Sequence, residues 1–319
     1  MKKIVALVLF LGLMLSAKAQ QPLSMSDYWN HLGKGYNNML KGILDYNIET
    51  VHGSDASLLR AKISKIDLDI NNGLQNCESL LLSNPENVEI TKMVREILIG
   101  MRTDLNTKTW LGGILSTVAP TYREQYEELK NSAKRQERLD SMGLQMIRIG
   151  NLFMRKNKDE ISILPSSGAM DSLLRQSAGT IEYARKMEFI RIGVLIYLHD
   201  VLKYSGDFSC DSVKIALAAL EQQLILAKGT LKKIGYYNGD NMLSRQTERC
   251  LAITDAALAK DLKVMYNFCK RFKDESLSAT DIDQYNNIVK NKIPILMKQW
   301  KKLIEIEDAF LKKYMPKKD

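Results

Sequence analysis

Apolar residues recur at alternating steps of three and four residues over most of this 319-residue chain. That spacing places them on one face of an α-helix, and long packed helices bury such a face against one another. The clearest series fall within residues 59–81, 213–234 and 251–272. Sustained alternation with a period of two is missing, so the pattern predicts an all-α fold with essentially no β-sheet.

Prolines, turn-forming clusters and capping boxes divide this pattern into eight helices. Capping boxes are expected where Ser24 precedes Asp27, where Thr121 precedes Glu124 and where Ser278 precedes Asp281. Pro294 alone lies inside a periodic run, where we expect a kink. The expected helices span roughly residues 25–52, 55–83, 86–117, 121–158, 169–204, 209–235, 240–275 and 280–314.

The eight helices divide as four plus four, which predicts two antiparallel four-helix-bundle units in tandem. The fourth and eighth helices open with the same residue types at the same spacing, which indicates an internal duplication, although any two long amphipathic helices share some pattern. The matching residues are Thr121, Glu124, Gln125 and Tyr126 against Thr280, Asp283, Gln284 and Tyr285. The segment at 165–168 is the natural boundary, so we expect units at 20–165 and 166–319.

The first 19 residues have the organisation of a cleaved secretory signal peptide. Lys2 and Lys3 precede an apolar run from Ile4 to Leu15, and small residues, Ala17 and Ala19, stand before Gln20. A run of 12 apolar residues is too short to cross a bilayer core as an uncleaved anchor. We therefore expect export to the periplasm or cell surface, cleavage before Gln20 and no membrane span in the mature protein.

The positive charge concentrates toward the C-terminus, where residues 290–319 carry 9 Lys against 4 acidic residues. A basic end can contact anionic lipid, polysaccharide or nucleic acid, or it can be a solvated helix face. No aromatic residues alternate with these lysines as stacking on bases would require. A nucleic-acid partner is therefore not expected.

Four cysteines are present, and none forms a Cys-x-x-Cys pair that would indicate a zinc or redox site. Cys210 and Cys269 lie on the apolar faces of the sixth and seventh helices, at nearly equal distances from the turn near Gly239. The two helices should form a hairpin, so a Cys210–Cys269 disulfide is the expected pairing, with two buried thiols as the alternative. Cys77 and Cys250 have no evident mates.

Catalytic and metal motifs are not recognisable in the sequence. Glu49 and His52 share a helix face, but a di-iron bundle needs that pair twice with two further glutamates, so no metal site is expected. His52 is better interpreted as a cation at the C-terminal end of the first helix. No Cys-x-x-Cys-His haem motif, nucleophile elbow or phosphate-binding loop occurs, so we expect no cofactor and no enzymatic activity.

The first helix contains the candidate residues for a ligand-binding site. It carries Gly33, Gly35 and Gly42, each of which costs about 1 kcal/mol relative to Ala in a helix, and such a cost indicates close helix approach or a groove. An aromatic core face is one interpretation. The other is a groove for a sugar, a peptide or a small apolar ligand. Its candidate ligand-binding residues are Trp29, Tyr36, Tyr46 and His52.

The order of Tyr28, Trp29 and Asn30, then Tyr46, then His52 and Gly53, with Arg60 and the segment 153–164 further on, resembles an uncharacterised family of exported bacterial surface proteins. The resemblance covers mainly residues 25–165. It implies a helical, secreted or lipid-anchored protein without an established activity. The chain lacks the lipobox cysteine and the basic residue soon after His52 that the family pattern would contain.

These observations favour a non-enzymatic exported protein that binds a protein partner or a cell-envelope component. A carrier of a sugar, lipid or other apolar molecule in a bundle groove is the first alternative, and an enzyme with an unrecognised helical site is the second. The sequence leaves the oligomeric state open.

Overall fold

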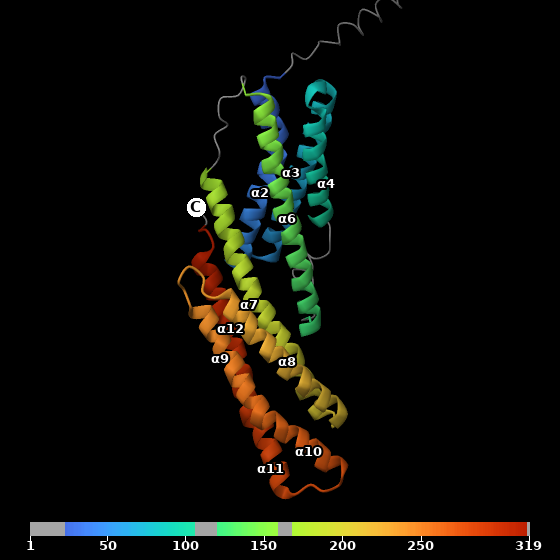
Figure 1. Cartoon of the computed structure of the whole chain (residues 1–319), viewed down its shortest axis with the longest axis vertical. Helices are drawn as coiled ribbons and strands as arrows, with labels where there is room; N and C mark the ends of the chain where they lie inside the picture. The colour runs from blue at the N-terminus through green and yellow to red at the C-terminus, as the bar shows by residue number, and fades with distance from the viewer. Residues whose placement is uncertain (1–22, 106–119, 159–167, 318–319) are drawn as a thin grey trace, which may run out of the picture. The chain divides into compact units, whose positions relative to one another are not determined.

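The computed structural model describes residues 23–105, 120–158 and 168–317 (Figure 1). Its described secondary structure is helical, without a β-strand, so the predicted all-α fold is confirmed. The predicted signal peptide and the expected unit boundary near Pro165 lie outside the described residues. None of the described helices combines the length and the apolarity that crossing a bilayer would require.

The contacts divide the chain into two units, and the long helix α6 (Tyr122–Lys156) contributes to both. Residues of α6 up to Lys134 belong to unit 2, and those from Arg135 onward belong to unit 1. The predicted internal duplication stays a prediction.

Unit 1 is a bundle of α2 (Met25–Val51) up to Tyr46, α3 (Ala56–Ser83), α4 (Val88–Leu105) and the second part of α6, with a short 3₁₀ turn η1 (Pro85–Asn87) before α4. Buried Tyr28 of α2 forms a 2.6 Å hydrogen bond to Thr91 of α4. Phe153 of α6 stacks on Tyr28, with 5.4 Å between ring centroids. The Tyr28 hydroxyl thus has a buried hydrogen-bond partner, as a tyrosine in a core requires.

Two glycines bring α2 and α3 into close contact. A Cβ added to Gly35 would lie 2.3 Å from Cα of Gly73, and one added to Gly73 would lie 3.0 Å from Cα of Gly35. The helix backbones therefore meet where neither residue has a side chain. A Cβ at Gly42 would similarly press on Ile66 at 2.8 Å, whereas one at Gly33 would meet only the Asn37 side chain at 3.7 Å. Close helix approach thus explains Gly35 and Gly42, and leaves Gly33 unexplained.

Unit 2 contains residues 47–54, the first part of α6 and the chain from Asp171 onward. Its core is formed by apolar faces of α7 (Gly168–Gly206), α8 (Cys210–Ile234), α9 (Met242–Ala257) and α12 (Ile293–Tyr314). The core series predicted on α8 is buried at Val213, Leu220 and Leu224. Tyr126 of α6 packs edge-on against Phe189 of α7.

The last two predicted helices of unit 2 each contain a π turn. The turn η2 (Leu258–Leu262) separates α9 from α10 (Lys263–Lys273), and η3 (Ile288–Lys292) separates α11 (Ala279–Asn287) from α12. Pro294 lies in the first turn of α12, immediately after η3. The sequence predicts a kink at Pro294, and the structure has a π turn on its N-terminal side, one of the recognised causes of helix bending.

Candidate functional site

The aromatic face predicted on α2 lies mostly inside unit 1. Leu32 and Met39 are completely buried, and Tyr36 is 8% exposed. Trp29 is half-buried and stacks on Phe153 of α6, with ring centroids 4.9 Å apart. The packing of these four residues is that of core side chains, which is one of the two interpretations that the sequence allows.

The other predicted ligand-binding residues, Tyr46 and His52, lie near the end of α2. Tyr46 is half-buried, whereas His52 is exposed in the turn that follows the helix. Glu49 is buried and accepts a hydrogen bond from the Ser54 hydroxyl, so its carboxylate is engaged in closing this turn. Among the residues that the structure describes, no three His, Cys, Asp or Glu side chains gather closely enough to hold a metal ion.

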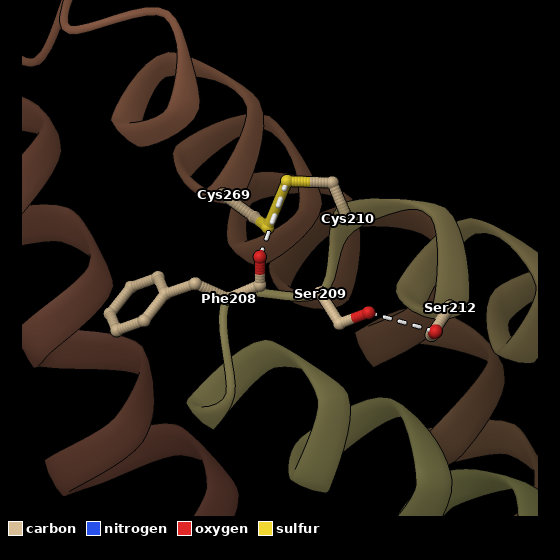
Figure 2. Close-up of a disulfide and its surroundings, with 5 residues drawn as sticks. All are labelled: Phe208, Ser209, Cys210, Ser212 and Cys269. Atoms are coloured by element: carbon tan, nitrogen blue, oxygen red, sulfur yellow. Dashed lines mark hydrogen bonds between the residues drawn. A yellow bond between two sulfur atoms is a disulfide. The ribbon is translucent and has the colours of Figure 1, made fainter.

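The structure joins Cys210 and Cys269 in a disulfide, the pairing that the helix faces predict (Figure 2). The bond ties the first residue of α8 to α10, with 5.7 Å between the two Cα atoms. Phe208, in the turn before α8, stacks on Phe272 of α10 with ring centroids 4.4 Å apart. The α7–α8 turn is thus held against α10 by a covalent bond and by aromatic packing, which fixes the start of α8.

The surface of α8 that points away from the core of unit 2 carries large aliphatic side chains. Ile215, Ile225 and Leu226 are 71%, 67% and 64% exposed. We define the outer face of α8 as the exposed or half-exposed stripe that these residues share with smaller neighbours, spaced three and four apart. Its members are Ile215, Ala218, Ala219, Gln222, Ile225, Leu226 and Gly229.

The outer face has no charged residue between Asp211 at its start and Lys233 at its end. The charged residues within this length of α8 lie to one side, and one of them, Lys228, forms a 2.8 Å ion pair with Asp255 of α9. This absence of charge distinguishes the outer face of α8 from the exposed apolar residues of α6. There Leu144 and Ile147 are also exposed, but Asp140 and Arg148 lie on the same face.

A groove runs along one border of the outer face, between α8 and the α9–η2 segment. Its volume is about 240 Å³, and Ala218 belongs to both the groove and the outer face. Leu217, Leu258 and Ala259 form its apolar part, and Glu221, Asp255 and Lys263 its polar part. The π turn η2 supplies Leu258 and Ala259, and π turns are frequent at functional sites.

Sequence reasoning identified the inward face of α8 and missed the outer one. The available signal was the set of three aliphatic residues, Ile215, Ile225 and Leu226, that do not fit the inward series. A helix that is apolar on two faces needs something to cover both of them. Unit 2 covers the inward face and leaves the outer face exposed.

No family model, curated protein or solved structure matches this chain. The resemblance to exported bacterial surface proteins therefore stays a prediction, and the functional argument depends on the surface of the chain itself.

Proposed function

We propose that this protein is an exported, non-enzymatic binding protein whose partner is another protein, held on the outer face of α8. The observation that carries the proposal is the exposure of Ile215, Ile225 and Leu226 on one charge-free stripe. Contiguous exposed apolar surface is a mark of protein interaction sites, and amphipathic helices commonly present such stripes to their partners.

The energetic gain from covering this face is substantial. Complete burial of one Leu or Ile side chain contributes about 1.5–3 kcal/mol. Each of the three residues has about two-thirds of its side chain still in water. A partner that covers all three would therefore gain several kilocalories per mole before the cost of association.

The dimensions of the neighbouring groove favour a protein partner over a small-molecule cargo. Sites for small ligands usually have volumes of about 300–1,000 Å³. The groove beside α8 holds about 240 Å³ and is bordered by the charged residues Glu221, Asp255 and Lys263. It is better suited to one side chain of a docked protein than to a sugar or a lipid.

Export is part of the proposal, and two features support it. The N-terminal segment has the pattern of a signal peptide. The Cys210–Cys269 disulfide is of a kind that persists in oxidising compartments and is rare in a reducing cytosol. We expect the intact mass of the protein recovered from its host to correspond to a chain that begins at Gln20.

Site-specific photo-crosslinking in the producing cell tests the binding face. A photoreactive amino acid at Ile225 should give a discrete adduct, and the same group at Ile304, an exposed residue of α12, should not. Adding Leu226→Glu to the Ile225 probe should abolish the adduct, because it places a charge within the apolar stripe. If neither Ile215 nor Ile225 gives an adduct above the level seen at Ile304, the proposed function is wrong.

A further inference from the structure

We propose that the partner of the outer face of α8 is a second copy of the same chain, with the two α8 helices packed antiparallel about a two-fold axis near Gln222. This inference rests on the proposed function, because it identifies the protein that covers the same face. It is carried by the distribution of charge and of side-chain size along the stripe.

The two ends of the outer face carry opposite charges. Asp211 lies on the face at its N-terminal end and Lys233 at its C-terminal end, both exposed, while Lys214 and Lys232 lie to one side of the face. In an antiparallel pair, Asp211 of one copy lies beside Lys233 of the other. A parallel pair would instead place acid against acid and lysine against lysine, so charge complementarity selects the antiparallel arrangement. The helix dipoles favour the same choice.

Side-chain size along the stripe is complementary under the same symmetry. Residues that are equally distant from Gln222 on opposite sides face one another across a two-fold axis at that residue. Ile215 then lies opposite Gly229, and the small pair Ala218 and Ala219 lies opposite Leu226 and Ile225. Large residues therefore meet small ones along the whole stripe, which lets the two helices approach closely and interlock.

The flanks of α8 leave room for this pairing. On the side toward α7, Gln223 packs close to Gly193 of α7 and is only half-exposed. On the other side, Lys228 is held by Asp255 of α9. The neighbouring helices thus lie beside the stripe and not over it, as the exposure of its three aliphatic residues shows. A symmetric pair uses the same patch twice and closes on itself, which is the commonest arrangement in homo-oligomers.

One helix from each copy makes a modest interface, which sets the conditions of the test. Stable complexes typically bury about 1,200–2,000 Å² in total, and a single pair of helices of this length buries less. We therefore expect a reversible dimer with a dissociation constant in the micromolar range. Sedimentation equilibrium from about 1 to 200 µM covers that range. It should show a shift from the monomer mass to twice that mass.

Matched variants tie the dimer to this face. Leu226→Glu should weaken dimerisation at least tenfold, and Leu82→Glu, at an exposed leucine of α3, should leave it unchanged. Asp211→Lys should weaken it, and adding Lys233→Asp should restore it, since the charges at the two ends of the face are then reversed in both copies. Loss of dimer in both single variants with no rescue by the charge reversal would exclude the antiparallel pairing.

Cysteine crosslinking locates the axis. Gln222→Cys should form an intermolecular disulfide on mild oxidation, because the two residues 222 meet at the axis. Thr230→Cys, eight positions further along the same helix, should not. Its two copies would be about 24 Å apart at a rise of about 1.5 Å per residue. Crosslinking at Thr230 but not at Gln222 would contradict the proposed register.

The photo-crosslinking experiment separates the two proposals. An adduct at Ile225 with twice the mass of the chain, in which both partners are this protein, supports the dimer. An adduct with a different protein, together with a purified chain that stays monomeric throughout the concentration range, would show that self-pairing is wrong while a protein-binding face remains. Absence of any adduct on the face overturns both.

Discussion

The Nε atom of Arg191 on α7 lies 3.5 Å from a carboxylate oxygen of Glu307 on α12, inside unit 2. Their side chains are 8% and 11% exposed. A second carboxylate, that of Glu188 on α7, accepts a 2.8 Å hydrogen bond from Nη2 of Arg191. One buried guanidinium group therefore interacts with two carboxylates. Its contact with Glu188 is shorter than its contact with Glu307.

This arrangement makes the stability of unit 2 dependent on pH. Burial, together with the negative charge of Glu188, raises the pKa of Glu307 to about 7, although Arg191 opposes both effects. The ordinary pKa of a Glu carboxyl is 4.5. Between these values the folded state binds more protons than the unfolded state, so the stabilising contribution is lost as pH rises from about 4.5 through 7.

Glu307→Gln should remove that loss. The difference in the free energy of unfolding, Glu307→Gln minus the native chain, should increase from pH 5 to pH 8 by on the order of 2–3 kcal/mol. Urea denaturation at the two pH values measures it, and Glu305→Gln, at an exposed residue of the same helix, is the control. Parallel pH profiles for the native chain and Glu307→Gln would contradict this reading of the cluster.

The contact of Gly35 with Gly73 should make α2 intolerant of even one added methyl group. Gly35→Ala would place Cβ 2.3 Å from the Cα atom of Gly73, so α2 and α3 must separate. We expect a loss of about 1–3 kcal/mol in the stability of unit 1, which is the usual cost of overpacking. Hydrogen exchange of α3 amides, followed by mass spectrometry, should show faster local opening.

Gly33→Ala is the matched control on the same helix, two residues away. Its Cβ would meet only the Asn37 side chain at 3.7 Å. The substitution replaces a poor helix former by the best one, so stability should rise by up to about 1 kcal/mol. Equal effects of the two substitutions would mean that helix propensity, and not the helix crossing, governs both sites.

Helix positions could be read from the sequence because their signals are local. The capping boxes at Thr121 and Ser278 form as predicted, each with hydrogen bonds in both directions between the two members. Periodic apolar residues identify the inward face of each helix before its partner is known. The fold class and the helix ends within the described residues therefore follow from spacing and caps, while the predicted helix end near residue 117 lies outside the described residues.

Features that depend on tertiary packing could not be predicted in the same way. The π turns at 258–262 and 288–292 add one residue to a helical turn without a distinctive local sequence, so periodicity registers them as ordinary helix. The three glycines of α2 look alike in sequence, and only the position of Gly73 distinguishes Gly35 from Gly33. The outer face of α8 was missed for a related reason, since apolar residues on two faces of a helix suggest burial until the structure leaves one face uncovered.

The four cysteines should differ sharply in reactivity. Without reductant, a denatured sample should show two thiols, from Cys77 and Cys250, and prior reduction should raise the count to four. In the folded protein those two thiols should react slowly, since burial raises the pKa of each to about 11. A thiol-reactive chromophore measures all three states. Four reactive thiols in the unreduced sample would show that the Cys210–Cys269 bond does not form.

Replacing Cys210 and Cys269 together by Ser should lower the stability of unit 2. The bond closes a loop with a sequence separation of 59 residues. In the chain-entropy model, closing a loop of that length in the unfolded state is worth about 4 kcal/mol. Thermal denaturation followed by circular dichroism should show an earlier transition for the double variant. Addition of reductant should shift the native chain to the same transition and leave the variant unaffected.

A buried polar contact between α9 and α12 gives a local test of the core of unit 2. The indole N–H of Trp300 donates a 3.1 Å hydrogen bond to the hydroxyl of Thr254, and both residues are buried. Thr254→Val keeps the shape of the side chain but leaves the indole N–H without an acceptor, which should cost about 1–3 kcal/mol. Thr254→Ser retains the hydroxyl and loses only a methyl group, so it should cost about 1 kcal/mol. Because α9 and α12 are joined at this point, the loss should appear in hydrogen exchange of both helices. A Val variant no less stable than the Ser variant would show that the hydrogen bond contributes nothing beyond packing.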